Sequence, residues 1–105
     1  MSETIHCRED FLSVLRNAGS RLVVAEFLQR NCGHCRTMSS SFNDLADRYY
    51  NVKFCTIDIN EVQDLDLCSF ITGTPTFYFY RNQQKIHEYV GSNASTLENK
   101  IQQMM

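Results

Sequence analysis

The sequence contains no long apolar run and no excess of basic residues. No run approaches the roughly 20 apolar residues that a membrane-spanning helix needs. Lys and Arg together number 10 against 12 Asp and Glu, so the formal net charge is -2. This charge provides no extended positive surface for nucleic acid or for an anionic membrane. We therefore expect neither a membrane nor nucleic acid as a partner.

Recognisable targeting signals are also missing. The first residues, MSETIHCRED, contain no basic segment followed by an apolar one, which a secretory signal requires. The last residues, IQQMM, are not an endoplasmic-reticulum retention signal. If the sequence is full length, we expect a cytoplasmic protein.

The five cysteines do not form the pattern of a disulfide scaffold or of a zinc site. A chain without a secretory signal is not expected to depend on several structural disulfides. Structural zinc sites need four ligands, usually as two spaced pairs, but Cys7, Cys55 and Cys68 each stand alone. We expect no metal, and we interpret Cys55 as a core residue because it lies in a strand pattern.

A chain of 105 residues, 43% of them hydrophobic, is long enough for one domain with its own core and too short for two. Apolar residues recur at helical spacing in three stretches, at 10–18, 38–49 and 97–104. Strand patterns occupy residues 22–28, 53–59, 76–80 and 85–90, and the last two read as a hairpin.

Weaker signals complete this outline. Gly19 supplies a stop for the first helix, and Asn60 is expected to begin a short helix. Ser95 and Glu98 have the spacing of a capping box for the last helix, and residues 4–7 are expected to add an edge strand. The alternation of helices and strands predicts a mixed sheet covered by helices.

The most informative stretch is LVVAEFLQRNCGHCR, residues 22–36, in which an apolar strand pattern leads into Cys32-Gly33-His34-Cys35 and then a helix. Two residues between the cysteines allow both sulfurs to lie on the first helical turn. The free backbone N–H groups and the positive dipole end of the helix stabilise a thiolate there, which lowers the pKa of the first thiol. The pattern predicts a dithiol/disulfide redox centre, with Cys32 attacking and Cys35 resolving.

This stretch, together with Thr74-Pro75-Thr76 and Gly91, resembles the thioredoxin superfamily over nearly the whole chain. The resemblance implies an α/β thioredoxin fold: a central mixed β-sheet of four to five strands flanked by about four helices. It implies a single thioredoxin-like domain over residues 1–105. The Gly-His pair inside the motif resembles protein disulfide isomerase domains, whereas thioredoxins usually carry Gly-Pro.

Two further residues are candidates for the chemistry. His34 can stabilise a thiolate by a hydrogen bond or by charge; the alternative is a solvated loop histidine. Glu26 is the one acid in an apolar strand, where a carboxylate is costly unless it is neutralised or paired. The resemblance implies that this acid exchanges a proton with Cys35; the alternative is a solvated strand face.

The resemblance also implies a substrate groove opposite the cysteines. Pro75 is expected to follow a cis peptide bond, the backbone of Thr74 to pair with an extended substrate, and Gly91 to allow its close approach. Asn31 and Gly33 are placed in the same groove. Asn31 departs from the family, because a tryptophan commonly stands there and its loss removes an apolar docking surface.

The leading hypothesis is therefore a protein-disulfide oxidoreductase that reduces protein disulfides through a mixed disulfide at Cys32. It needs no bound cofactor, and its electrons are expected from NADPH through a thioredoxin reductase. We expect a monomer whose partners are that reductase and protein disulfide substrates. Two alternatives stay open: a disulfide oxidase or isomerase, and a non-catalytic binding module with the same fold.

Overall fold

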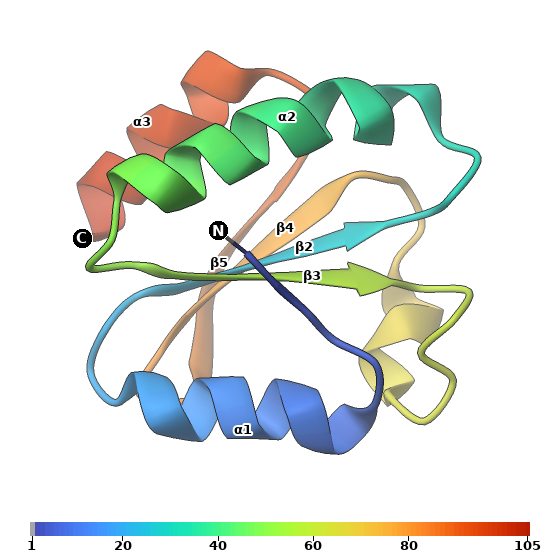
Figure 1. The fold of residues 1–105 in the computed structure, drawn as a ribbon, viewed down its shortest axis with the longest axis horizontal. Coiled ribbons are helices and arrows are strands. Elements are labelled where there is room, and N and C mark those ends of the chain that lie inside the picture. Colours follow the sequence, from blue (N-terminus) through green and yellow to red (C-terminus); the bar gives the residue numbers. More distant parts are fainter. Residues whose placement is uncertain (1) are drawn as a thin grey trace.

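A five-stranded mixed sheet runs through the middle of the computed structural model, which describes residues 2–105 (Figure 1). In chain order, the elements are β1 (Glu3–Thr4), α1 (Arg8–Ala18), β2 (Val23–Leu28), α2 (Gly33–Arg48), β3 (Lys53–Asp58), the 3₁₀-helix η1 (Asp66–Phe70), β4 (Thr76–Arg81), β5 (Gln84–Val90) and α3 (Ala94–Met104). The strand order across the sheet is β1-β3-β2-β4-β5. The expected α/β thioredoxin fold is confirmed.

Strand β2 lies at the centre of the sheet. It runs parallel to β3 and antiparallel to β4, while β1 extends the parallel side and β5 the antiparallel side. Helices cover both faces of β2, which explains why residues 22–28 read as an almost unbroken apolar run. In this register, Glu26 pairs with Thr56 on β3 and with Phe77 on β4.

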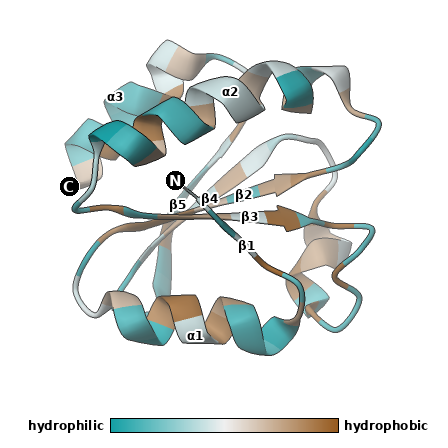
Figure 2. Ribbon diagram, viewed as in Figure 1, coloured by the Kyte–Doolittle hydropathy of each residue, from teal (hydrophilic) through white to brown (hydrophobic). Residues whose placement is uncertain are grey.

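Helices α2 and α3 cover one face of the sheet, and α1 and η1 cover the other (Figure 1). Each face has its own hydrophobic core. The core under α1 includes Phe11, Phe27 and Tyr78, and the core under α2 and α3 includes Phe42 and Phe77. Hydrophobic and hydrophilic residues alternate along the three α-helices (Figure 2), as expected of helices with one buried side.

The helical stripes predicted from the sequence are the buried ones. Helix α1 buries Phe11, Val14, Leu15 and Ala18, and it ends at Gly19, whose φ of 61° favours glycine. An edge strand was predicted at residues 4–7, but the strand that forms, β1, covers only residues 3–4, where it pairs with β3. None of the helices within residues 2–105 combines the length and apolar character needed to cross a bilayer.

The helices within residues 2–105 are three α-helices and the short 3₁₀-helix η1, close to the predicted four. No helix begins at Asn60, where the sequence predicted one. Instead, the Asp58 carboxylate accepts a hydrogen bond from the Asn60 backbone N–H at 2.9 Å, and the Asp58 carbonyl accepts from Val62 at 3.1 Å. These bonds hold a turn. The short 3₁₀-helix η1 forms later, at Asp66.

The capping box at Ser95 and Glu98 was also wrong. Asn93 is the N-cap of α3, and its side-chain oxygen accepts from the Thr96 backbone N–H at 3.0 Å. Glu98 is used elsewhere, since its carboxylate accepts hydrogen bonds from Arg48 and from the Tyr49 hydroxyl. A cap two residues earlier satisfies the first turn of the helix just as well.

Candidate active site

Cys32 is the N-cap of α2. Its backbone is extended, with φ -109° and ψ 113°, and its Sγ accepts the backbone N–H of Cys35 at 3.1 Å. The first turn of a helix always leaves such N–H groups without intrahelical partners. A sulfur at this position therefore receives both a hydrogen bond and the positive end of the helix dipole, which favour the thiolate.

The two sulfurs of the motif form a disulfide, with the Cα atoms 5.1 Å apart. Their exposure differs. Cys32 is partly exposed, whereas Cys35 is 2% exposed because it belongs to the buried stripe of α2. The pair can therefore be reached from solvent only through its first member.

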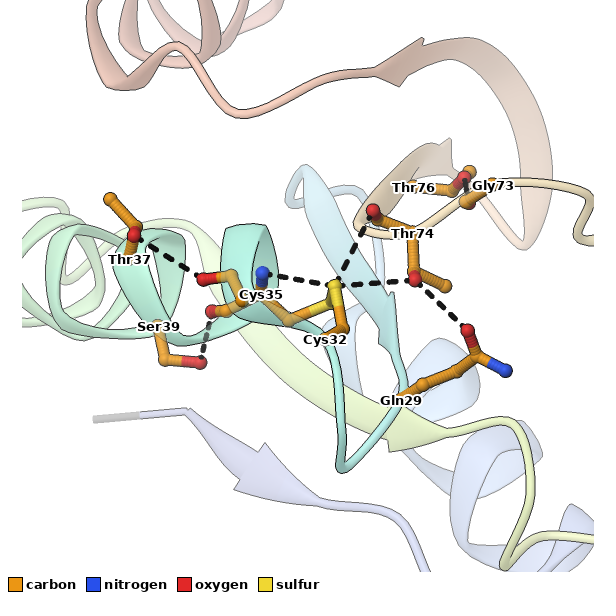
Figure 3. The surroundings of a disulfide bond; sticks show 9 residues. Gln29, Cys32, Cys35, Thr37, Ser39, Gly73, Thr74 and Thr76 are labelled. Atoms are coloured by element: carbon orange, nitrogen blue, oxygen red, sulfur yellow. Dashed lines mark hydrogen bonds between the residues drawn. A yellow bond between two sulfur atoms is a disulfide. The ribbon is translucent and has the colours of Figure 1, made fainter.

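A second loop faces Cys32 from the start of β4 (Figure 3). The peptide bond between Thr74 and Pro75 is cis, as the family resemblance implied. Cys32 Sγ lies 3.5 Å from the Thr74 carbonyl oxygen and 3.4 Å from its hydroxyl. Gly91 lies beside the same loop, donating its N–H to the Pro75 carbonyl at 3.3 Å.

Gln29 belongs to this site, although the sequence analysis did not single it out. Its side-chain oxygen accepts a hydrogen bond from the Thr74 hydroxyl at 3.2 Å (Figure 3). A hydroxyl has one proton to donate, so Thr74 can give it either to Gln29 or to the sulfur of Cys32. A disulfide sulfur is a poor acceptor and a thiolate a good one. Whether Thr74 donates to Gln29 or to Cys32 can thus depend on the redox state of Cys32.

The remaining residues around the motif are open to solvent. Asn31, Gly33 and His34 are all exposed, and a Cβ atom placed on Gly33 would meet nothing within 4 Å. The substrate-binding role expected for Asn31 and Gly33 and the thiolate-stabilising role expected for His34 stay predictions. Within residues 2–105, the His34 imidazole makes no hydrogen bond to either cysteine.

Glu26 is buried at the centre of the sheet. Its side chain is 1% exposed, so the alternative of a solvated strand face does not hold. Burial raises the pKa of Glu26 from its ordinary 4.5 to about 8, against a smaller lowering by a hydrogen bond from Thr56. Its Oε2 has no hydrogen-bond partner among the described residues, Cys35 included. The carboxyl can therefore hold or release a proton near neutral pH.

The other three cysteines are free thiols. Cys55 is fully buried on β3, as predicted, and burial is the main cause that raises its pKa to about 12. Cys68 on η1 is partly buried, and its pKa is raised mainly by desolvation. Over residues 2–105, no three His, Cys, Asp or Glu side chains are grouped as metal ligands.

Comparison with known proteins identifies the family. The thioredoxin family model matches residues 3–103. Thioredoxin from Mus musculus is 37% identical over 101 residues, which is 96% of each chain. Thioredoxin from Ophiophagus hannah is 36% identical over 96 residues, or 91% of each chain.

Solved structures agree. A poplar thioredoxin h superposes with a TM-score of 0.91 at 30% identity, covering 98% of this chain and 95% of that one. Fasciola hepatica thioredoxin reaches a TM-score of 0.92 over 98% of this chain, but at 22% identity it bears on the fold alone. With a disulfide between Cys32 and Cys35 at the start of α2, the chain belongs to the thioredoxin family of protein disulfide oxidoreductases.

Proposed function

We propose that Cys32 attacks protein disulfides and that Cys35 resolves the mixed disulfide. The observation that carries this assignment is the contrast between the two cysteines: Cys32 is partly exposed at the N-cap, and Cys35 is 2% exposed one turn further along α2. Only Cys32 can meet a sulfur on another protein.

In the first step, the Cys32 thiolate attacks one sulfur of the substrate disulfide. A new S–S bond joins Cys32 to the substrate, and the other substrate sulfur leaves as a thiolate and takes a proton. In the second step, Cys35 loses its proton and attacks Cys32 Sγ, which releases the second substrate thiol. The substrate gains two electrons and two protons, and the Cys32–Cys35 dithiol becomes the disulfide.

The loop opposite Cys32 supports a role in substrate binding. The Thr74 carbonyl lies 3.5 Å from Cys32 Sγ. An extended substrate segment that carries the target sulfur to Cys32 would therefore pass beside this carbonyl. We propose that Thr74 and cis-Pro75 pair with this segment and that Gly91 allows it to approach. Asn31 and Gly33, both exposed beside Cys32, are proposed to line the same groove, where Asn31 would offer the substrate a polar contact in place of an aromatic one.

We propose that Glu26 accepts the proton that Cys35 loses in the second step. A base suited to this task has a pKa near the working pH, and burial gives Glu26 a pKa of about 8. When the reaction runs in reverse, the neutral acid returns the proton.

His34 is proposed to raise the reduction potential of the couple. It occupies the position of the histidine in disulfide isomerase motifs, where an imidazole stabilises the thiolate and hence the reduced form. This residue favours, as a second candidate function, a disulfide oxidase or isomerase. The direction of net transfer then depends on the redox partners available.

The remaining proposals follow from family membership. The chain is proposed to act as a single thioredoxin-like domain over residues 1–105, as a cytoplasmic monomer without a bound cofactor. Its electrons would come from NADPH through a thioredoxin reductase, and its substrates would be protein disulfides.

Turnover of a model protein disulfide in the presence of NADPH and a thioredoxin reductase tests this function. We expect steady NADPH consumption by the native chain and none by Cys32→Ser. Cys35→Ser should accumulate the mixed disulfide, which a gel without reductant reveals. Oxidation of a reduced substrate by the Cys32–Cys35 disulfide, without NADPH turnover, would instead support the oxidase.

A further inference from the structure

A polar hollow adjoins Glu26 between α2, β1 and β3. It has a volume of about 290 Å³ and is lined by Glu26 together with Ser2, Thr4, Ser39, Asn43 and Thr56. Within residues 2–105, no hydrogen bond joins a side chain of this lining to Cys32 or Thr74. In Figure 3, Ser39 and Thr74 lie on opposite sides of the disulfide.

The hollow can hold water. Liquid water occupies about 30 Å³ per molecule, and a buried water needs two to four polar partners. The lining supplies hydroxyl groups from three elements and one side-chain amide. Among the residues that line it, Glu26 is the one titratable group, so a proton that enters from solvent has a single acceptor there.

Polar side chains at hydrogen-bond distance lead from Asn43 through Ser2 and Thr56 to the acid. Ser2 Oγ donates to the Asn43 side-chain oxygen at 3.1 Å, and it lies 3.2 Å from the Thr56 hydroxyl. The Thr56 hydroxyl in turn bonds the Glu26 carboxyl. Ser2 thus bridges α2 and β3 above the buried acid.

The inner end of the hollow reaches the helical turn that carries the resolving cysteine. Ser39 donates to the Cys35 carbonyl at 2.8 Å and lines the same space as Glu26 (Figure 3). The other carboxyl oxygen, Glu26 Oε2, has no protein partner. The acid therefore has one oxygen bound by Thr56 and one free to bond to water.

We propose that this hollow is a hydrated proton port, through which Glu26 exchanges protons with solvent while a protein substrate covers Cys32, with Ser2, Asn43 and Thr56 as positioning residues. The inference rests on the proposed proton transfer between Cys35 and Glu26. In the mixed disulfide, the substrate protein blocks the groove side of Cys32. A proton taken from Cys35 then needs another way out.

The other titratable groups on the elements around Glu26 do not carry this proton to solvent. Helix α2 contributes the buried Cys35, and β3 contributes the buried Cys55, whose thiol pKa is about 12 and which does not ionise near neutral pH. Glu3 on β1 and Lys53 on β3 also act on Cys55, but they form an ion pair with each other and do not line the hollow. On β4, the residue paired with Glu26 is Phe77, which has no exchangeable group.

The test uses Asn43→Leu, which fills the mouth of the hollow and removes the anchor of Ser2. Asn43 is exposed on α2, and leucine is a good helix former, so the protein should fold. Asn43→Ser keeps the site small and polar. Asn17→Leu is the matched control, because it fills a separate hollow of about 250 Å³ between α1 and β1 that does not contain Glu26.

The mixed disulfide with a model protein substrate is trapped, and its decay is timed from pH 6 to 9. We expect Asn43→Leu to slow the decay by about threefold to tenfold, less than the roughly 10²- to 10⁴-fold that a positioned acid or base contributes, because Glu26 itself is kept. Asn43→Ser and Asn17→Leu should decay at the native rate. In the Glu26→Gln background, Asn43→Leu should add no further slowing.

A second measurement does not depend on turnover. The carboxyl carbon of Glu26 is titrated by NMR, and Asn43→Leu should raise its pKa further because water is excluded from the carboxylate. Two results would overturn the port: native decay in Asn43→Leu, or slowing that persists after Glu26→Gln. If Glu26→Gln alone decays at the native rate, the proton role of Glu26 fails, and the port fails with it.

Discussion

The Thr74 hydroxyl lies 3.4 Å from the Sγ atom of Cys32, although 42 residues separate the two in the sequence. This contact joins the loop of the cis peptide bond to the start of α2. It places a hydrogen-bond donor beside the sulfur that becomes a thiolate, in addition to the N–H of Cys35.

Thr74→Val should make Cys32 less reactive. Valine has nearly the shape of threonine but cannot donate a hydrogen bond, and such a bond is worth about 1 kcal/mol, or roughly fivefold. We expect iodoacetamide to modify Cys32 several times more slowly at neutral pH. Thr37→Val is the control, because the Thr37 hydroxyl bonds the Gly33 carbonyl instead of the sulfur. Unchanged reactivity in Thr74→Val would remove Thr74 from thiolate stabilisation.

Mild alkylation of the reduced protein should label Cys32 well before Cys35. Cys35 is 2% exposed and Cys55 is fully buried with its pKa raised to about 12, so neither presents an accessible thiolate. Peptide mapping by mass spectrometry separates these sites from the partly exposed Cys7 and Cys68. Faster labelling of Cys35 would reverse the two assigned roles.

His34→Pro should make the couple more reducing by some tens of millivolts. The imidazole stabilises the thiolate of the reduced form, and a change of about 30 mV corresponds to roughly 1.4 kcal/mol for two electrons. Equilibration with glutathione buffers measures the potential. His87→Pro is unsuitable as a control because His87 lies within β5, so His6→Ala is preferred. An unchanged or higher potential would leave His34 as a solvated loop residue.

Glu26→Gln should stabilise the protein, increasingly so as the pH rises from 4.5 to 8. The pKa of Glu26 is about 8 in the folded chain and 4.5 ordinarily. Between these values the native state therefore holds one proton more than the unfolded state, and the free energy of unfolding falls with rising pH. At about 1.4 kcal/mol per pH unit, the effect reaches roughly 5 kcal/mol above pH 8. Urea unfolding of the oxidised protein at pH 5 and pH 8 measures it.

Glu98 provides a contrast for this experiment. Hydrogen bonds from Tyr49 and then from Arg48 lower the pKa of Glu98. The stability from this lowered pKa is present above the ordinary value and is lost as the pH falls through the folded one. Glu98→Gln should therefore destabilise at neutral pH and have less effect in acid. If the difference in the free energy of unfolding between Glu26→Gln and the native protein were constant with pH, Glu26 would not titrate in this range.

The local features of this protein could be predicted from its sequence. The apolar stripe of α1, the apolar run of β2 and the Cys32–Cys35 spacing each depend on residues that are close in the chain. Helical and strand periodicities report such local geometry directly. The redox centre itself could be read in this way, because both sulfurs lie on one helical turn.

Features that compete locally were less predictable. Asn60 and Ser95 both have the character of N-caps, but the cap positions were decided by Asp58, which holds a turn, and by Asn93, which begins α3. Such alternatives differ by about 1 kcal/mol or less. Packing of the neighbouring elements selects among them.

Only the tertiary structure determines the surroundings of the two functional groups. Ser2 meets Thr56 and Asn43 because β1 pairs with β3 beneath α2, and Gln29 meets Thr74 because β2 and β4 are neighbours in the sheet. The sequence shows that Glu26 is the one acid in an apolar strand. Its raised pKa depends on burial, which results from the packing on both faces of the sheet. The order of strands sets these distances, and no spacing along the chain encodes that order.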